Sequence, residues 1–83
     1  MDYSLSKHAL VVMSERGIDE LYLRKTLEDP ELILDDSIDG ELQHRLKAIP
    51  EYENRVLRVI VNNSKSPINV VTVYFDRSMR GKL

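Results

Sequence analysis

The sequence predicts an α+β fold in which two N-terminal helices pack on one face of a four-stranded antiparallel sheet. Residues 6–29 have the end signals and apolar spacing of two short helices. Residues 55–62 and 68–75 are apolar runs rich in β-branched residues, separated by turn formers, as in an antiparallel hairpin. No repeat or low-complexity segment interrupts the 83 residues, so we expect a single domain, 1–83.

The composition narrows the classes of function. Cysteine is absent and there are only two histidines, so we expect neither a metal site nor a cofactor. No apolar run reaches the ~20 residues that span a bilayer, and the N-terminus lacks the apolar region of a signal peptide. We therefore expect a cytoplasmic protein with no membrane partner. Because so small a core gives little stability, a homodimer or a bound partner protein is an open alternative.

Charge is divided between the halves of the chain, although the net charge is only −2. Residues 1–41 carry 4 basic and 11 acidic side chains, whereas residues 42–83 carry 8 basic and 3 acidic ones. This asymmetry indicates an anionic partner for the basic half. The alternative is that the two halves attract one another.

Two helices are predicted from their end signals. Ser6 is a good N-cap for a helix that runs to Arg16, and Gly17 suits the left-handed position that ends it. Asp19 caps a second helix, which Pro30 stops near residue 28 or 29. The short connection predicts a compact helical hairpin.

Four strands are predicted after the helices. Residues 31–34 form a short strand, and residues 41–49 alternate between apolar and polar along a second strand. Since the apolar set belongs inside, His44 and Leu46 are assigned to the core side, and Arg45 and Lys47 to the opposite side. Residues 50–54 form a turn that leads into the hairpin.

The hairpin strands have one apolar face and one mixed face. The residues assigned to the core are Leu57, Val59, Val61, Val71, Val73 and Phe75. The sheet face away from the helices, which we call the open face, would carry Val56, Arg58, Ile60, Ile68, Val70, Thr72 and Tyr74. Its apolar part requires a cover, which could be the C-terminal tail, a second copy or a partner helix.

Cations on the open face indicate an RNA partner. The expected surface combines residues of three strands and the tail: Arg45, Lys47, Arg58, Tyr74, Arg77 and Arg80. Arginine forks bind phosphate through two hydrogen bonds, and a tyrosine ring offers a surface on which a base can stack. The alternative is that these cations are ordinary solvated decoration of a sheet.

The chain resembles a family of small bacterial proteins, the domain of unknown function DUF4258, through the ordered motifs SKHALVVMSERGI, TLEDPELI, RVLRVIVN and VVTVYFD. That family is similar in layout to the RelE, ParE and BrnT toxins of type II toxin–antitoxin pairs. The resemblance implies a RelE/ParE-like fold and an mRNA endoribonuclease that an antitoxin neutralises. It implies attack of an RNA 2′-hydroxyl on the neighbouring phosphate without a metal, with Lys47, Arg58 and Tyr74 as catalytic residues. It further implies that Arg45, Arg77 and Arg80 bind the RNA.

Two alternatives stay open. His8 and His44 are both assigned to inward faces and form a second candidate catalytic pair, since imidazole groups titrate near neutrality. A simpler role for His8 is that of a core-edge histidine bonded to a carbonyl. The alternative function is a non-catalytic interaction module that docks an antitoxin or another protein on the open face.

Overall fold

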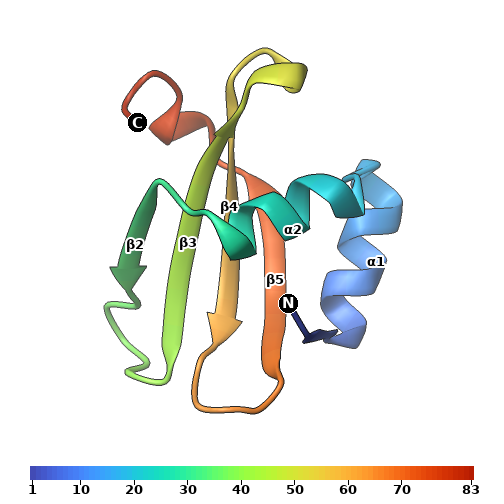
Figure 1. The fold of residues 1–83 in the computed structure, drawn as a ribbon, viewed down its shortest axis with the longest axis vertical. Coiled ribbons are helices and arrows are strands. Elements are labelled where there is room, and N and C mark those ends of the chain that lie inside the picture. Colours follow the sequence, from blue (N-terminus) through green and yellow to red (C-terminus); the bar gives the residue numbers. More distant parts are fainter.

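The computed structural model describes residues 1–83 and has two helices packed against a five-stranded mixed sheet (Figure 1). The elements in chain order are β1 (Tyr3–Leu5), α1 (Lys7–Arg16), α2 (Glu20–Glu28), β2 (Leu32–Asp35), β3 (Leu42–Ile49), η1 (Pro50–Tyr52), β4 (Arg55–Asn62), β5 (Ile68–Phe75) and η2 (Arg77–Met79), where η1 and η2 are 3-10 helices. The predicted α+β class is confirmed. Neither α1 nor α2 is both long and apolar enough to cross a membrane.

Both helices begin and end at the predicted residues. The Ser6 side chain accepts a hydrogen bond from the backbone N–H of Ala9, and Gly17 ends α1 in the left-handed conformation at φ 62°. The Asp19 side chain accepts from the backbone N–H of Leu21 at the start of α2. These local interactions satisfy backbone groups that every helix leaves free at its ends.

The predicted four-stranded antiparallel sheet is wrong in one respect, because β1 adds a fifth strand in parallel to β5. The strand order is β1-β5-β4-β3-β2. Ser6 fixes this pairing: its backbone N–H donates to the carbonyl of Val70 at 2.9 Å, and its hydroxyl donates to the carbonyl of Val71 at 2.7 Å. The first turn of α1 is therefore tied to β5.

The main core lies between the helices and one face of the sheet. Helical residues Ala9, Met13, Leu23 and Leu27 pack with Ile18 against strand residues Ile49, Leu57, Val59, Val61, Val70 and Val73. Burial of this apolar surface is the largest favourable contribution to the stability of the fold.

The two faces of β3 are the reverse of those predicted. Lys47 pairs with Leu57 and Arg45 pairs with Val59, which places both cations on the helix side. The guanidinium of Arg45 donates to the carbonyl of Leu27 at 2.9 Å, and the Lys47 ammonium donates to the carbonyl of Asp29 at 3.0 Å. The carbonyls at the C-terminal end of α2 lack helical partners, so basic side chains are stabilising at this position.

A β-bulge changes the predicted faces of three residues near the start of β5. Ile60 pairs with Thr72 whereas Val61 pairs with Val70, so Val71 is an extra residue in β5. Val70 consequently turns to the helix side and is fully buried, and Val71 is only partly buried. The predicted positions of Ile68, Val70 and Val71 were therefore wrong, because a bulge shifts the alternation of side chains by one residue and Ile68 too packs against the main core.

The C-terminal segment covers one end of the open face. Leu46 and Val56 lie on this face and are nonetheless almost fully buried. The backbone N–H of Asp76 donates to the carbonyl of Val56 at 2.8 Å, and Arg80 donates to the carbonyl of Glu53 at 3.0 Å. Figure 1 shows this segment folding back near the ends of β3 and β4. The tail is thus the cover of the apolar surface at this end.

Replacing Val59 by Asp is expected to unfold the protein. Val59 is fully buried in the main core, and an unpaired charge there costs several kcal/mol, about the whole stability of a domain of this size. Circular dichroism during urea titration measures the effect. The control Val11→Asp makes the same chemical change on an exposed part of α1 and should keep a cooperative transition. Cooperative folding of both variants would contradict the assigned core.

Candidate functional site

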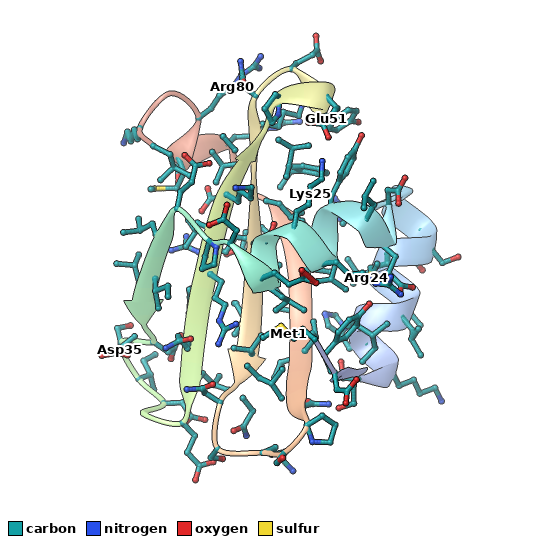
Figure 2. All side chains as sticks on the ribbon, viewed as in Figure 1. Met1, Arg24, Lys25, Asp35, Glu51 and Arg80 are labelled. Carbon is teal, nitrogen blue, oxygen red and sulfur yellow. The ribbon has the colours of Figure 1, made fainter.

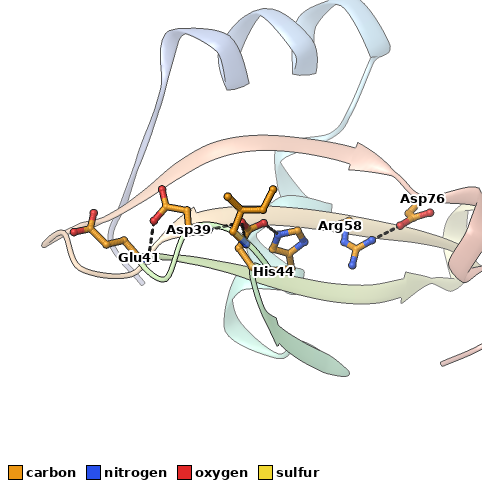
Figure 3. Close-up of polar contacts among 7 residues, drawn as sticks. Asp39, Glu41, His44, Arg58 and Asp76 are labelled. Carbon is orange, nitrogen blue, oxygen red and sulfur yellow. Dashed lines mark hydrogen bonds and ion pairs between the residues drawn. The ribbon is translucent and has the colours of Figure 1, made fainter.

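A hydrogen-bonded pair, His44 with Asp36, and an ion pair, Arg58 with Asp76, lie on the open face (Figure 3). Nε2 of His44 lies 2.7 Å from Oδ1 of Asp36, and the guanidinium of Arg58 lies 2.5 Å from Oδ2 of Asp76. All four side chains are at least three-quarters buried. Nδ1 of His44 and Nε of Arg58 are also buried and have no hydrogen-bond partner. The two pairs form a polar row in the middle of a largely apolar surface.

Asp36 anchors the loop between β2 and β3. Its side chain accepts hydrogen bonds from the backbone N–H groups of Asp39 and Ile38 as well as bonding His44. The hydrogen bond from Asp39, followed by the one from His44, lowers the pKa of Asp36 to about 2. Asp36 is therefore ionised at neutral pH and orients the imidazole of His44.

Asp76 connects the sheet to the tail. Its Oδ1 accepts from the hydroxyl of Ser78 at 2.6 Å and from the backbone N–H of Ser78 at 3.0 Å, which caps η2. The Ser78 hydroxyl is the main cause that lowers the pKa of Asp76, and Arg58 lowers it further. The predicted position of Arg58 on the open face is confirmed, but its guanidinium is occupied by Asp76. Arg58 therefore helps to hold the segment that follows β5.

A cleft of about 690 Å³ surrounds the half of β5 that has no strand partner on its outer side. Its walls come from α1, from the turn that contains η1, and from the tail. The polar side chains that line it are His8, Arg16, Thr72, Tyr52, Arg55, Tyr74, Asp76, Arg77 and Arg80. Figure 2 shows Arg80 projecting beside η1 at one end of the molecule. We call this hollow the arginine cleft.

The arginine cleft carries an excess of positive charge. It has four arginines but a single carboxylate, Asp76, which is already paired with Arg58. Arg16, Arg77 and Arg80 form no ion pair, and the carboxylate nearest to Arg55 is that of Glu53 at 3.9 Å. Grouped cations without counter-charges attract anions, and a concave surface strengthens this attraction.

Two exposed tyrosines flank these cations. The guanidinium of Arg55 lies 4.7 Å from the centre of the Tyr52 ring, and that ring packs at 5.0 Å from the ring of Phe75. Tyr74 pairs directly with Arg58 across β4 and β5 and is 38% exposed. Flat rings held beside arginines offer stacking surfaces next to phosphate-binding groups.

The cleft brings together only some of the predicted site residues. Tyr74, Arg77 and Arg80 line it, and so does His8, which is exposed on α1. The predicted pairing of His8 with His44 is wrong, because His44 lies on the open face and contacts Asp36. Arg45 and Lys47 support the end of α2 on the helix side, and Arg58 binds Asp76.

Three residues of the cleft escaped the sequence analysis. Arg16 falls on the apolar stripe of its helix, and Tyr52 and Arg55 lie in or beside a turn, where periodicity carries no information. Their common feature in the sequence is an exposed cation or aromatic at the end of an element. Only the fold shows that these ends meet.

No group of three or more histidine and carboxylate side chains is placed to hold a metal ion. A family model described as a domain of unknown function (DUF4258) matches residues 5–75. Neither the curated proteins nor the solved structures contain a significant match to the chain. The matched residues include both helices and strands β2 to β5.

Arg58→Ala and Asp76→Ala are each expected to destabilise the protein by about 2 kcal/mol, because each leaves the partner charge unpaired in a largely buried position. The double variant should lose clearly less than the sum of the two. Urea unfolding of the four proteins measures this coupling. The exposed pair of Lys25 and Glu51 provides the control and should show much weaker coupling. Additive losses at Arg58 and Asp76 would show that this ion pair does not hold the tail.

Proposed function

The chain belongs to the DUF4258 family, and we propose that it is a toxin-like endoribonuclease that binds single-stranded RNA in the arginine cleft. The observation that carries this proposal is the gathering of four arginines, two exposed tyrosines and one exposed histidine around a single carboxylate that is already paired. The resemblance of the sequence motifs to RelE- and ParE-like toxins, and the layout of two helices on one face of a sheet, also support it.

Single-stranded RNA suits the cleft because both its phosphates and its unpaired bases can be bound there. Arg16 and Arg77 form no ion pair and can bind phosphate oxygens through pairs of N–H groups. Arg80 donates one N–H group to the carbonyl of Glu53 and has further N–H groups for phosphate. Tyr52 and Tyr74 offer ring faces on which unpaired bases can stack. A rigid duplex needs no such stacking surfaces, so the cleft favours a bent single strand.

The proposed reaction is a transesterification within the RNA. The 2′-hydroxyl attacks the neighbouring phosphorus, the bond from phosphorus to the 5′-oxygen breaks, and the products are a 2′,3′-cyclic phosphate and a 5′-hydroxyl. His8 moves a proton to or from one of the reacting oxygens, a task for which imidazole is well suited. The arginines neutralise charge that develops on the phosphate, which is commonly the largest contribution to catalysis.

This proposal reassigns several of the predicted roles. Arg58 acts as a positioning residue, because through Asp76 it holds the tail that carries Arg77 and Arg80. Lys47 and Arg45 stabilise the end of α2 and take no part in binding. Tyr74 keeps its predicted place beside the RNA.

A second candidate function is a docking module for an antitoxin or another protein on the open face. The observation in its favour is the pair of buried, unpartnered nitrogens, Nδ1 of His44 and Nε of Arg58. Because such groups cost free energy when left unsatisfied, a partner that supplies a donor to Nδ1 of His44 and an acceptor to Nε of Arg58 would gain affinity. This candidate requires no chemistry in the arginine cleft.

Replacing Arg77 and Arg80 together by Ala should weaken the binding of a single-stranded RNA oligonucleotide without unfolding the protein, since both side chains are exposed. The slope of log Kd against log salt concentration should fall by about 1.4, because each lost phosphate contact removes about 0.7 for a single strand. His8→Ala should retain binding and slow cleavage by roughly 10²–10⁴-fold. Fluorescence anisotropy and end-labelled cleavage assays provide the readouts.

Lys65→Ala is the matched control, because Lys65 is an exposed cation in the hairpin loop outside the cleft. It should change neither binding nor cleavage. Wild-type protein that binds no RNA at low salt would refute the proposal. Loss of binding in the Lys65 variant equal to that in the cleft variant would show that the attraction is not specific to the cleft.

A further inference from the structure

Strand β2 ends the sheet and has a free edge. It pairs only with β3, and the backbone N–H of Asp36, just after the strand, donates to the carbonyl of Leu42 at 3.1 Å. Backbone groups of an antiparallel strand alternate in direction from residue to residue, so those of Ile33 and Asp35 face outward. The outer edge of β2 therefore presents unpaired donors and acceptors that a further strand can use.

Aliphatic side chains accompany this free edge. Ile33 is 50% exposed, Leu34 is 38% exposed, and Ile38 in the following loop is 94% exposed. Ile33 and Leu34 point to opposite faces of the sheet, since they pair with Arg45 and His44 respectively. An added strand would thus find apolar contacts on both faces of the sheet.

The charged residues of the segment that forms this edge are all acidic. Residues 28–41 include seven carboxylates and neither lysine nor arginine. Lys47 binds Asp29, and His44 binds Asp36. The other five carboxylates are exposed and form no ion pair: Glu28, Glu31, Asp35, Asp39 and Glu41. Arg45, the cation opposite Ile33, turns inward to the carbonyl of Leu27.

The free backbone groups, the aliphatic side chains and the carboxylates of this edge together favour one kind of partner. Two copies of β2 joined at their edges would bring their carboxylates together, so like charges oppose self-association. Nucleic acid is repelled for the same reason. We propose that the edge of β2 binds an extended segment of a partner protein in which basic and apolar residues alternate, as a sixth strand of the sheet.

The proposed docking edge on β2 is remote from the half of β5 that the arginine cleft surrounds. In the strand order β1-β5-β4-β3-β2, two strands separate β2 from β5. Figure 2 shows Asp35 at the β2 edge, away from Arg80. A partner bound at β2 leaves the cleft open, so this interaction would recruit the protein without blocking the cleft. It does not depend on whether the cleft binds RNA.

Nuclear magnetic resonance of the ¹⁵N-labelled protein tests this inference. The probe is a nine-residue peptide that alternates lysine with valine, and the control peptide has glutamate in place of lysine. The lysine peptide should slow amide hydrogen exchange of Ile33 and Asp35 at least tenfold, and its affinity should fall as salt is added. Asp35→Lys should weaken binding about tenfold, because it opposes the charge of the peptide at the centre of the edge.

Glu15→Lys provides the matched control, since it makes the same change in net charge at an exposed position on α1. This variant should bind the lysine peptide as the wild type does. Equal binding of the glutamate peptide, or protection of β5 amides in place of those of β2, would overturn the inference. So would protection of Ile33 and Asp35 by concentration-dependent self-association in the absence of peptide.

Discussion

The register of β4 against its two neighbours decides which side chains reach solvent on each face of the sheet. Opposite β3, it places Arg45 and Lys47 beside Val59 and Leu57, on the side of the helices. Opposite β5, the bulge at Val71 turns Val70 into the core. A shift of a single residue exchanges the two faces of a strand, so the whole surface depends on this pairing.

One consequence of this register is that the cations of the second half do not form a single patch. Arg45 and Lys47 satisfy carbonyls at the end of α2, and Arg58 binds Asp76. Through Asp76, the sheet fixes the start of the tail, whose arginines complete the cleft beside β5. Seven of the eleven carboxylates of the acidic first half lie in residues 28–41, around β2 at the other end of the strand order. Positive charge therefore gathers beside β5 and negative charge around β2, so the two ends of the strand order suit different classes of partner.

Local sequence signals predicted the local structure well. The caps at Ser6, Gly17 and Asp19 act within a few residues, so the sequence alone locates both helices. The parallel pairing of β1 was not predicted, because Ser6 finds its partner Val71 65 residues further along the chain. The faces of β3 were misassigned for two reasons. On the helix side, cations of β3 bind carbonyls at the end of α2, so this face is not purely apolar. On the open face, the C-terminal tail lies near one end of the strand, so apolar residues there are buried as well. The sequence identified Tyr74, Arg77 and Arg80 as site residues. It did not identify Arg16, because only the folded structure brings the end of α1 to the same cleft.

We propose that RNA binds in the arginine cleft and not in the middle of the open face. Chemical-shift mapping of the ¹⁵N-labelled protein during titration with a short single-stranded RNA tests this claim most directly. We predict that the largest shifts occur at Arg16, Tyr74, Arg77 and Arg80, around the free half of β5. Shifts concentrated at His44, Leu46 and Ile60 in the middle of the open face would contradict the account.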